Sequence, residues 1–236
     1  MIDLVRCDID YEGYISGNVK ELAKKLVRPS ICFDEWNVWG PVRAPGGKGA
    51  EELYDLSDAL AVAAWLNVFV RQAKHIGMAT IAHRVNVIAP LMTTERGFVK
   101  QTTYWPLLLF SRYMRRKSLA THVGSLAYKG KTCSGWLEST VDLPLLDVST
   151  ALSDDVWMNL AVVNISETED MSPTLHVQTI EGSVRVFAVG GSENHVRDNT
   201  QEGAEKVDIR ESIWKGKERF IFEKHSFTLM RWRVKV

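Results

Sequence analysis

The hydrophobic pattern of this chain changes its period at about residue 118, and this change constrains the fold more than any other feature. Before that point, apolar residues recur at the spacing of amphipathic helices, between short apolar runs that are typical of buried strands. After it, apolar residues take every second position, as in 156–162, 184–188 and 230–236. Period-two segments are typical of antiparallel strands. The chain is therefore predicted to join an α/β part, residues 1–117, to an all-β part, residues 118–236, that forms a β-sandwich.

The α/β part alternates helices with strands. Helices are predicted at 17–27, 51–75 and 102–117, and buried strands at 31–33 and 79–90. Such alternation indicates βαβ units and a parallel sheet. A closed eight-stranded βα barrel takes roughly 250 residues, so an α/β part with two strands is predicted to be a piece of a barrel or a very small sheet.

The composition favours an ordinary globular protein, with 45% hydrophobic and 25% charged residues. Lys plus Arg and Asp plus Glu both total 29, and no basic stripe occurs, so a nucleic-acid partner is not expected. The longest apolar runs fall short of the roughly 20 residues that a membrane span needs. The first residues, "MIDLVRCDIDYEG", carry acids where a secretory signal has its apolar core, so an intracellular location is expected.

Cysteines and histidines give no sign of a metal or cofactor. Cys7, Cys32 and Cys133 are scattered, without a CxxC pair, which argues against a disulfide framework and a structural zinc site. The six histidines lack metal-ligand spacing. The glycines of 46–49 read as a flexible loop, because no strand immediately precedes them and no Ser or Thr follows Gly-Lys as in a phosphate-binding loop. We expect neither a metal nor a cofactor.

The stretch "ICFDEWNVWG", residues 31–40, runs from an apolar strand into two carboxylates and two tryptophans. In parallel α/β structures, the carboxyl ends of strands form the active face. Successive strand residues point to opposite faces, so one of Asp34 and Glu35 is expected to face the mouth of a site and the other to support its wall. From the residues alone, a catalytic mouth and a solvated strand end beside core tryptophans explain the stretch equally well.

The same stretch closely resembles the nucleophile segment of the glycoside hydrolase family 51 α-L-arabinofuranosidases, whose seventh barrel strand ends in Asp-Glu-Trp-Asn-Val-Trp. The resemblance continues in order through "YDLSDALAVAAWLNVFVRQA", "VNVIAPLMTT", "QTTYWPLLLFSRYMR" and "KHSFTLMRW", and is strongest to the fungal intracellular branch. It implies the end of a (β/α)8 TIM barrel, namely strands 7 and 8 with helices 6 to 8, followed by a β-sandwich.

The resemblance also implies roles for particular residues. Glu35 takes the place of the nucleophile of a retaining mechanism, and Trp39 that of a tryptophan lining the sugar pocket. Asp34 and Asn37 fall in supporting places beside the nucleophile. On strand 8 the family commonly has a Gln that contacts arabinose, where this chain has His83 in "AHRVNVI". A histidine there can still offer one donor and one acceptor, although a lone histidine near a strand end is more often structural.

The implied reaction is hydrolysis of terminal non-reducing α-L-arabinofuranosyl residues from arabinan, arabinoxylan or arabino-oligosaccharides, with retention. A retaining enzyme needs a second carboxyl group, which the family carries on a Gly-Asn-Glu segment that this sequence lacks; the nearest string, around Glu193, lies in the all-β part. The alternative is a truncated, non-catalytic fragment or a carbohydrate-binding or interaction module. Because two barrel strands leave sheet edges open, a second copy or a missing N-terminal half is an expected partner.

Overall fold

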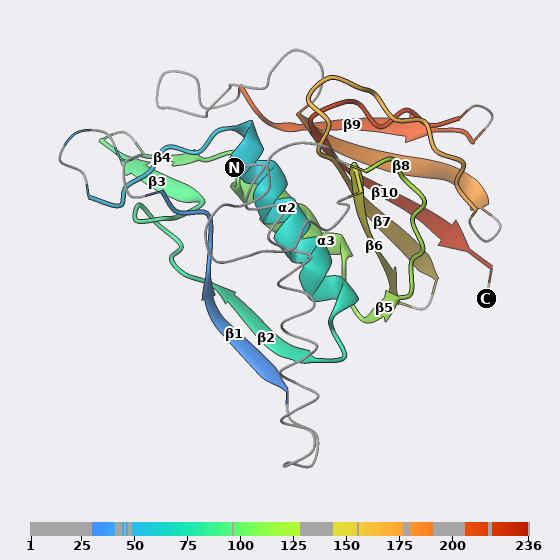
Figure 1. Cartoon of the computed structure of the whole chain (residues 1–236), viewed down its shortest axis with the longest axis horizontal. Helices are drawn as coiled ribbons and strands as arrows, with labels where there is room; N and C mark the ends of the chain where they lie inside the picture. The colour runs from blue at the N-terminus through green and yellow to red at the C-terminus, as the bar shows by residue number, and fades with distance from the viewer. Residues whose placement is uncertain are drawn as a thin grey trace.

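The computed structural model describes residues 30–40, 44, 46, 49–95, 97–127, 144–154, 156–176, 180–190, 206–216 and 219–235. The helix predicted at 17–27, Cys7, Cys133 and Glu193 lie outside these residues. The described residues form two helices, a two-stranded parallel sheet, a two-stranded hairpin and a six-stranded antiparallel sheet (Figure 1). Neither helix is long and apolar enough to cross a membrane.

A βαβ unit opens the described chain, as predicted. It consists of β1 (Ile31–Trp36), α2 (Leu56–Arg71) and β2 (Ile76–Ile81), and the two strands pair in parallel. The helix begins five residues later than predicted because Asp55 and Asp58 form a capping box. The Asp55 side chain accepts from the Asp58 amide at 3.1 Å, and the Asp58 side chain accepts from the Asp55 amide at 2.8 Å.

The second strand differs from the prediction of a buried strand over 79–90. β2 ends at Ile81, and the chain turns through Asn86 and Ile88, whose φ values of 65° and 46° belong to the left-handed region. Residues 77–80 are exposed, because α2 lies against one side of the strand pair. A hairpin that the sequence did not predict follows, formed by β3 (Leu91–Thr94) and β4 (Gly97–Lys100).

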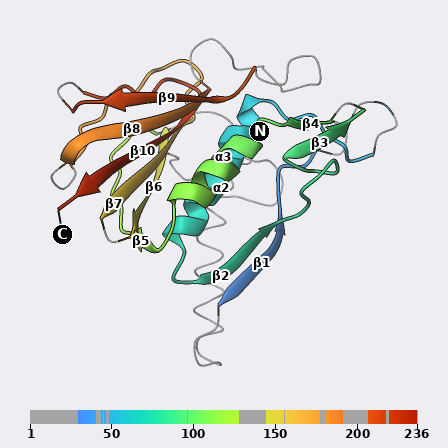
Figure 2. The same ribbon diagram turned by 180° about the vertical axis from the view of Figure 1, so that it is seen from behind.

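The helix predicted at 102–117 is shorter in the structure. α3 (Tyr104–Tyr113) has Thr103 at its N-cap and ends at Met114. Arg116, with φ of 78°, turns the chain into β5 (Lys117–Leu119), so the basic residues Arg115, Arg116 and Lys117 lie beyond the helix. α2 and α3 lie against the same face of the large sheet (Figure 2).

The large sheet holds the remaining strands, and all neighbours in it are antiparallel. Its members besides β5 are β6 (Leu146–Ser153), β7 (Trp157–Asn164), β8 (Ile180–Gly190), β9 (Ile209–Trp214) and β10 (Ser226–Val234). The order is β5-β6-β7-β10-β8-β9. The period-two segments at 156–162, 184–188 and 230–236 fall on β7, β8 and β10, which confirms the antiparallel interpretation.

Each face of this sheet carries its own core. On the inner face, Phe187, Phe227 and Leu229 pack with residues of α2 and α3. On the outer face, Val186, Met230 and Trp232 pack beneath the segments 119–126, 171–176 and 219–223. Met171 and Phe222 in these segments pair as an isolated bridge, so the segments form a thin second layer of the sandwich. The two helices and the large sheet share this inner core. The predicted domain boundary at 117/118 therefore stays a prediction.

Candidate functional site

The carboxyl ends of β1 and β2 meet at one edge, which is where the sequence places its candidate residues. Trp36 pairs with Ile81, and the Ala82 amide donates to the Trp36 carbonyl at 3.0 Å. Parallel strands paired in this way bring the residues that follow them to the same edge. The structure therefore brings Glu35, Asn37 and Trp39 to the same edge as His83. The side chains of Glu35, Trp39 and His83 are exposed there.

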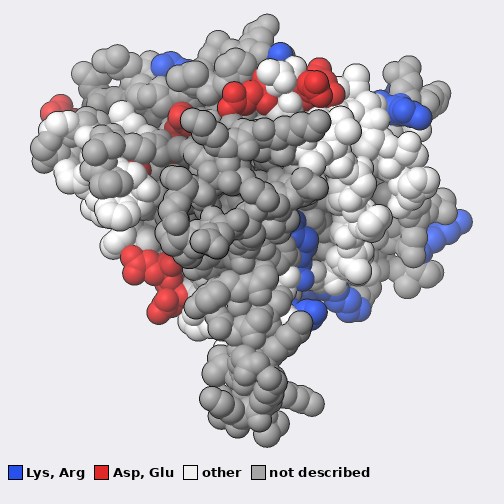
Figure 3. Space-filling model, viewed as in Figure 1, with Lys and Arg blue, Asp and Glu red and all other residues white. Residues whose placement is uncertain are grey.

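A β-bulge in β1 affects how the side chains of Asp34 and Glu35 are exposed. Phe33 pairs with Ala79 and Trp36 with Ile81, so three steps on β1 match two on β2. Both aromatic rings pack against Phe69 of α2, with centroids at 5.4 and 5.0 Å. The strict alternation that assigned the acids to opposite faces does not hold across the bulge. Asp34 and Glu35 are both exposed, and Figure 3 shows acidic side chains gathered over the β1 side of the molecule.

Asn37 ties together the segments that follow the two strands. Its side-chain amide donates to the carbonyl of Ile88, beyond β2. Its side-chain oxygen accepts from the Val38 amide at 2.8 Å. The half-buried asparagine thus has both polar atoms engaged, which fixes the chain direction just after Glu35. This position is consistent with the supporting place that the resemblance implies for Asn37.

Gln101 is a second side chain that joins these segments, and its role was not predicted from the sequence. The buried side chain accepts from the Tyr54 amide at 2.9 Å and donates to the carbonyls of Glu52 and Ala89 at 3.1 and 2.8 Å. It joins the segment leading into α2 to the segment after β2. In the sequence, Gln101 directly precedes Thr102 and Thr103 and looks like part of a helix start. Neither its residue type nor its position indicates that it joins two distant segments.

The backbone on both sides of Trp39 is held by buried side chains. The Tyr54 hydroxyl donates to the Val38 carbonyl at 2.8 Å, and a Glu52 carboxylate oxygen accepts from the Gly40 amide at 2.7 Å. Tyr54 and Glu52 are both fully buried, whereas the Trp39 indole is 58% exposed. A large apolar ring exposed on a fixed backbone is a ready surface for a ligand, because little conformational entropy is lost when it is covered.

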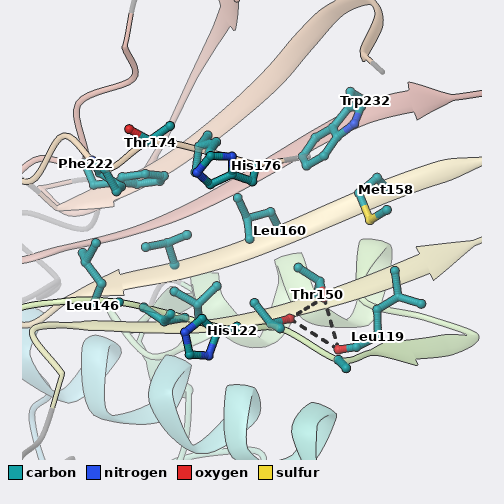
Figure 4. Close-up of a pocket in the computed structure, with 18 residues that line it drawn as sticks. Leu119, His122, Leu146, Thr150, Met158, Leu160, Thr174, His176, Phe222 and Trp232 are labelled. Atoms are coloured by element: carbon teal, nitrogen blue, oxygen red, sulfur yellow. Dashed lines mark hydrogen bonds between the residues drawn. The ribbon is translucent and has the colours of Figure 1, made fainter. Parts of the chain in front are cut away.

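Two cavities in the described part of the chain lie on the outer face of the large sheet, away from the strand ends. One of about 360 Å³ lies on the outer face of the sheet, with Leu160, Met158 and Trp232 among its lining residues, and with His122 and His176 on the loops that cover them (Figure 4). Among the described residues no group of three or more His, Cys, Asp or Glu is placed to hold a metal ion.

Among the described residues, the clearest change in pKa also lies away from the strand ends. Burial lowers the pKa of the Arg231 guanidinium, while Tyr113 and Asp154 act to raise it. Arg231 is a residue of β10 and lies over the ring of Trp157 at 4.5 Å. It therefore belongs to the packing of the sheet.

The sequence is similar to proteins of known family. The profile of the alpha-L-arabinofuranosidase C-terminal domain matches residues 34–226. A probable alpha-L-arabinofuranosidase C of Aspergillus clavatus is 53% identical over 208 residues, which are 88% of this chain and 40% of that protein. An intracellular exo-alpha-(1->5)-L-arabinofuranosidase of Halalkalibacterium halodurans is 29% identical over 193 residues, which are 77% of this chain and 36% of that protein. This chain thus spans about two fifths of the length of such relatives.

Solved structures show the same fold. An alpha-L-arabinofuranosidase from Thermotoga maritima in an arabinose complex matches with a TM-score of 0.86 at 22% identity, over 99% of this chain and 50% of that one. A GH51 alpha-L-arabinofuranosidase from Thermotoga petrophila RKU-1 matches with a TM-score of 0.81 at 22% identity, over 95% of this chain and 48% of that one. These matches confirm the predicted fold class, the end of a (β/α)8 barrel followed by a β-sandwich.

Proposed function

Because the chain belongs to the α-L-arabinofuranosidase C-terminal domain family, within glycoside hydrolase family 51, we propose that it supplies the nucleophile side of an arabinofuranosidase active site. The reaction would remove terminal non-reducing α-L-arabinofuranosyl residues from arabinan, arabinoxylan or arabino-oligosaccharides. One observation carries this proposal: the exposed carboxylate of Glu35 and the exposed indole of Trp39 share one edge of a parallel strand pair, on a hydrogen-bonded frame.

Glu35 would attack the anomeric carbon of the bound furanose. The glycosidic carbon–oxygen bond breaks, an ester to Glu35 forms, and the leaving oxygen takes a proton from a general acid. Water, deprotonated by the same group, then cleaves the ester with net retention. Asn37 would hold Glu35 in register, and the Trp39 ring would cover the apolar face of the sugar. His83, exposed beyond β2, would bind a sugar hydroxyl.

The general acid is a separate question. In a retaining enzyme the second carboxyl group lies about 5 to 5.5 Å from the nucleophile. The sequence has no Gly-Asn-Glu segment, and the relatives extend well beyond the length that this chain covers. We therefore propose that the acid/base comes from a part of the barrel outside the matched region, and that Glu35 alone can be tested without it.

The decisive assay uses an activated aryl α-L-arabinofuranoside and azide. A good leaving group needs little protonation, and azide needs no general base, so a lone nucleophile can still turn over. We expect azide-dependent release of nitrophenol that disappears in Glu35→Gln. The matched control is Glu95→Gln, an exposed carboxylate in the β3–β4 turn, which should keep the signal. Azide-dependent release that persists in Glu35→Gln would refute the assignment.

A second candidate function is that of a non-catalytic binding or interaction module. The exposed outer side of β2, including Met78 at 56% exposure, favours it, because such a side invites a partner. That partner would be a second copy or the complementary part of a barrel; we propose neither nucleic acid nor membrane. Folded protein without azide-dependent turnover, but with a dimer mass in solution, would select this alternative.

Two further expectations accompany the main proposal. We propose an intracellular location, which the name of the Halalkalibacterium relative supports. We also propose that residues 1–117 complete the catalytic face while residues 118–236 act as a β-sandwich domain. Limited proteolysis that releases a stable fragment beginning near residue 118 would support this division, and uniform degradation of both parts would argue against it.

A further inference from the structure

We infer that the outer face of the large sheet carries a second carbohydrate site, at β9, that takes an acidic sugar. A cavity of about 560 Å³ lies there, well within the range of small-molecule sites. Its lining combines the ring of Trp214 with the charged side chains of Arg210, Lys215, Arg219 and Glu223. The site belongs to the all-β part, so it goes beyond the proposed reaction at Glu35 and does not depend on it.

The aromatic wall of this cavity is fixed in place. Trp214, at the end of β9, packs edge-on against Phe220, with the ring centroids 5.7 Å apart. Phe220 in turn packs against the buried Phe222 at 4.8 Å. A half-buried indole held from behind offers flat apolar surface that suits the carbon–hydrogen face of a sugar ring.

Two of the residues that line the cavity are buried and carry hydroxyl groups. Ser226 and Thr228 of β10 are 1% and 3% exposed, and both contribute to the lining. The Ser226 hydroxyl donates to the Glu223 carbonyl at 2.6 Å, which fixes that side chain. Hydroxyl groups in a rigid strand are the kind of oriented polar groups that give a mostly apolar pocket its specificity.

The charged side chains that line the cavity give it a net positive charge. The Arg210 guanidinium is held by the Glu223 carboxylate and by the Gly190 carbonyl, each at 2.6 Å. Lys215 and Arg219 are exposed, and in the described part of the chain no ion pair is found for either. The lining of the cavity therefore carries three cations and one carboxylate, and this excess of positive charge favours an anion in the cavity. Figure 3 shows basic side chains near the end of β9.

These features select a sugar that carries a carboxylate. A neutral sugar would cover Trp214 but leave the excess positive charge without a partner. A small inorganic anion would pair with Lys215 and Arg219 but leave the aromatic wall uncovered. A uronic acid unit of an oligosaccharide satisfies both, because its ring stacks on the indole while its carboxylate meets the cations.

The test is calorimetric titration of the full 236-residue chain with trigalacturonate at low salt. We expect saturable binding that weakens at least tenfold in Trp214→Ala and in the double variant Lys215→Ala with Arg219→Ala. Neutral galactotriose should bind at least tenfold more weakly than trigalacturonate. The control Lys235→Ala removes an exposed cation at the end of the chain and should bind as the unaltered protein does.

Several outcomes would overturn the inference. Equal affinity for galactotriose would remove the role of the cations, and equal affinity for inorganic phosphate would remove the role of the sugar ring. Unchanged binding by the double variant would place the ligand elsewhere, and this variant decides the matter if Trp214→Ala fails to fold by circular dichroism. Glu35→Gln should leave trigalacturonate binding unchanged, so failure of this site and failure of the catalytic proposal are separable.

Discussion

The two main sheets of this chain differ in how completely the described chain covers them. In the six-stranded sheet, β10 is buried along nearly its whole length, with cores on both faces. In the two-stranded sheet, the middle four residues of β2 are exposed, and packing comes from α2 on one side. Hydrophobic stabilisation follows the apolar area removed from water. The large sheet should therefore be the more stable of the two, because both of its faces are covered, whereas the strand pair is covered by α2 on one side.

Phe227 offers the strongest test of the core on the inner face of the large sheet. Its ring is fully buried and stacks on Phe110 of α3 at 5.7 Å. Phe227→Ala removes a core ring and leaves a cavity, so we expect unfolding to become easier by about 4 kcal/mol. Urea denaturation followed by circular dichroism measures this. Ile213→Ala is the matched control, because Ile213 in β9 is 65% exposed and should change stability by less than about 0.5 kcal/mol.

Trp36 tests whether the strand pair depends on α2. The ring contacts Trp65 and Phe69 at 6.4 and 5.0 Å. Trp36→Ala should lower the local opening free energy of β1 and β2 by about 3 kcal/mol while β7 and β10 keep their protection. Hydrogen exchange resolved by segment reports both. Trp39→Ala serves as the control, since that ring is 58% exposed. Equal loss of protection in β10 would mean that the two sheets unfold as one unit.

The sequence predicted the two regions unequally, for a physical reason. Period-two spacing of large apolar residues located β7, β8 and β10, because every second residue of a strand points to the same face, and in these strands that face carries the outer core. The apolar run of 79–90 was read as one buried strand, yet the chain turns after Ile81. Left-handed backbone at Asn86 and Ile88 breaks the strand there, and no glycine marks the turn. Apolar content alone could not locate that turn.

Gln101 tests how much the segments at the ends of β1 and β2 depend on one buried side chain. Gln101→Glu keeps the acceptor for the Tyr54 amide but removes the two N–H donors to Glu52 and Ala89. Buried carbonyls left without donors cost about 1–3 kcal/mol. We expect faster exchange of the Gly40 and Tyr54 amides, with β10 unaffected. Gln101→Leu, which also removes the acceptor, should extend the loss at Tyr54. Unchanged hydrogen exchange of the Gly40 and Tyr54 amides in both variants would show that Gln101 does not hold these segments together.

The candidate site was predictable where its residues carry a motif and not where they act through packing. Glu35, Trp39 and His83 follow from the segments "DEWNVW" and "AHRVNVI", and the structure brings them to one edge. The support from Gln101 joins residues 12 and 49 positions away in the chain. Such a contact has no local signature, because only the folded chain brings its partners together. The roles of the motif residues stay predictions until Glu35→Gln is measured.

Met78 gives the smallest expected effect and the most direct test of the open side of β2. Its side chain is 56% exposed, whereas Met230 of β10 is fully buried. Met78→Thr should therefore change the unfolding free energy by less than about 0.5 kcal/mol, and Met230→Thr should lower it by about 3 kcal/mol, because it empties core volume and buries a hydroxyl. Urea denaturation at several protein concentrations measures both. If Met78→Thr costs as much as Met230→Thr, and the cost grows with protein concentration, the outer side of β2 is covered by a second copy in solution and the contrast between the two sheets fails.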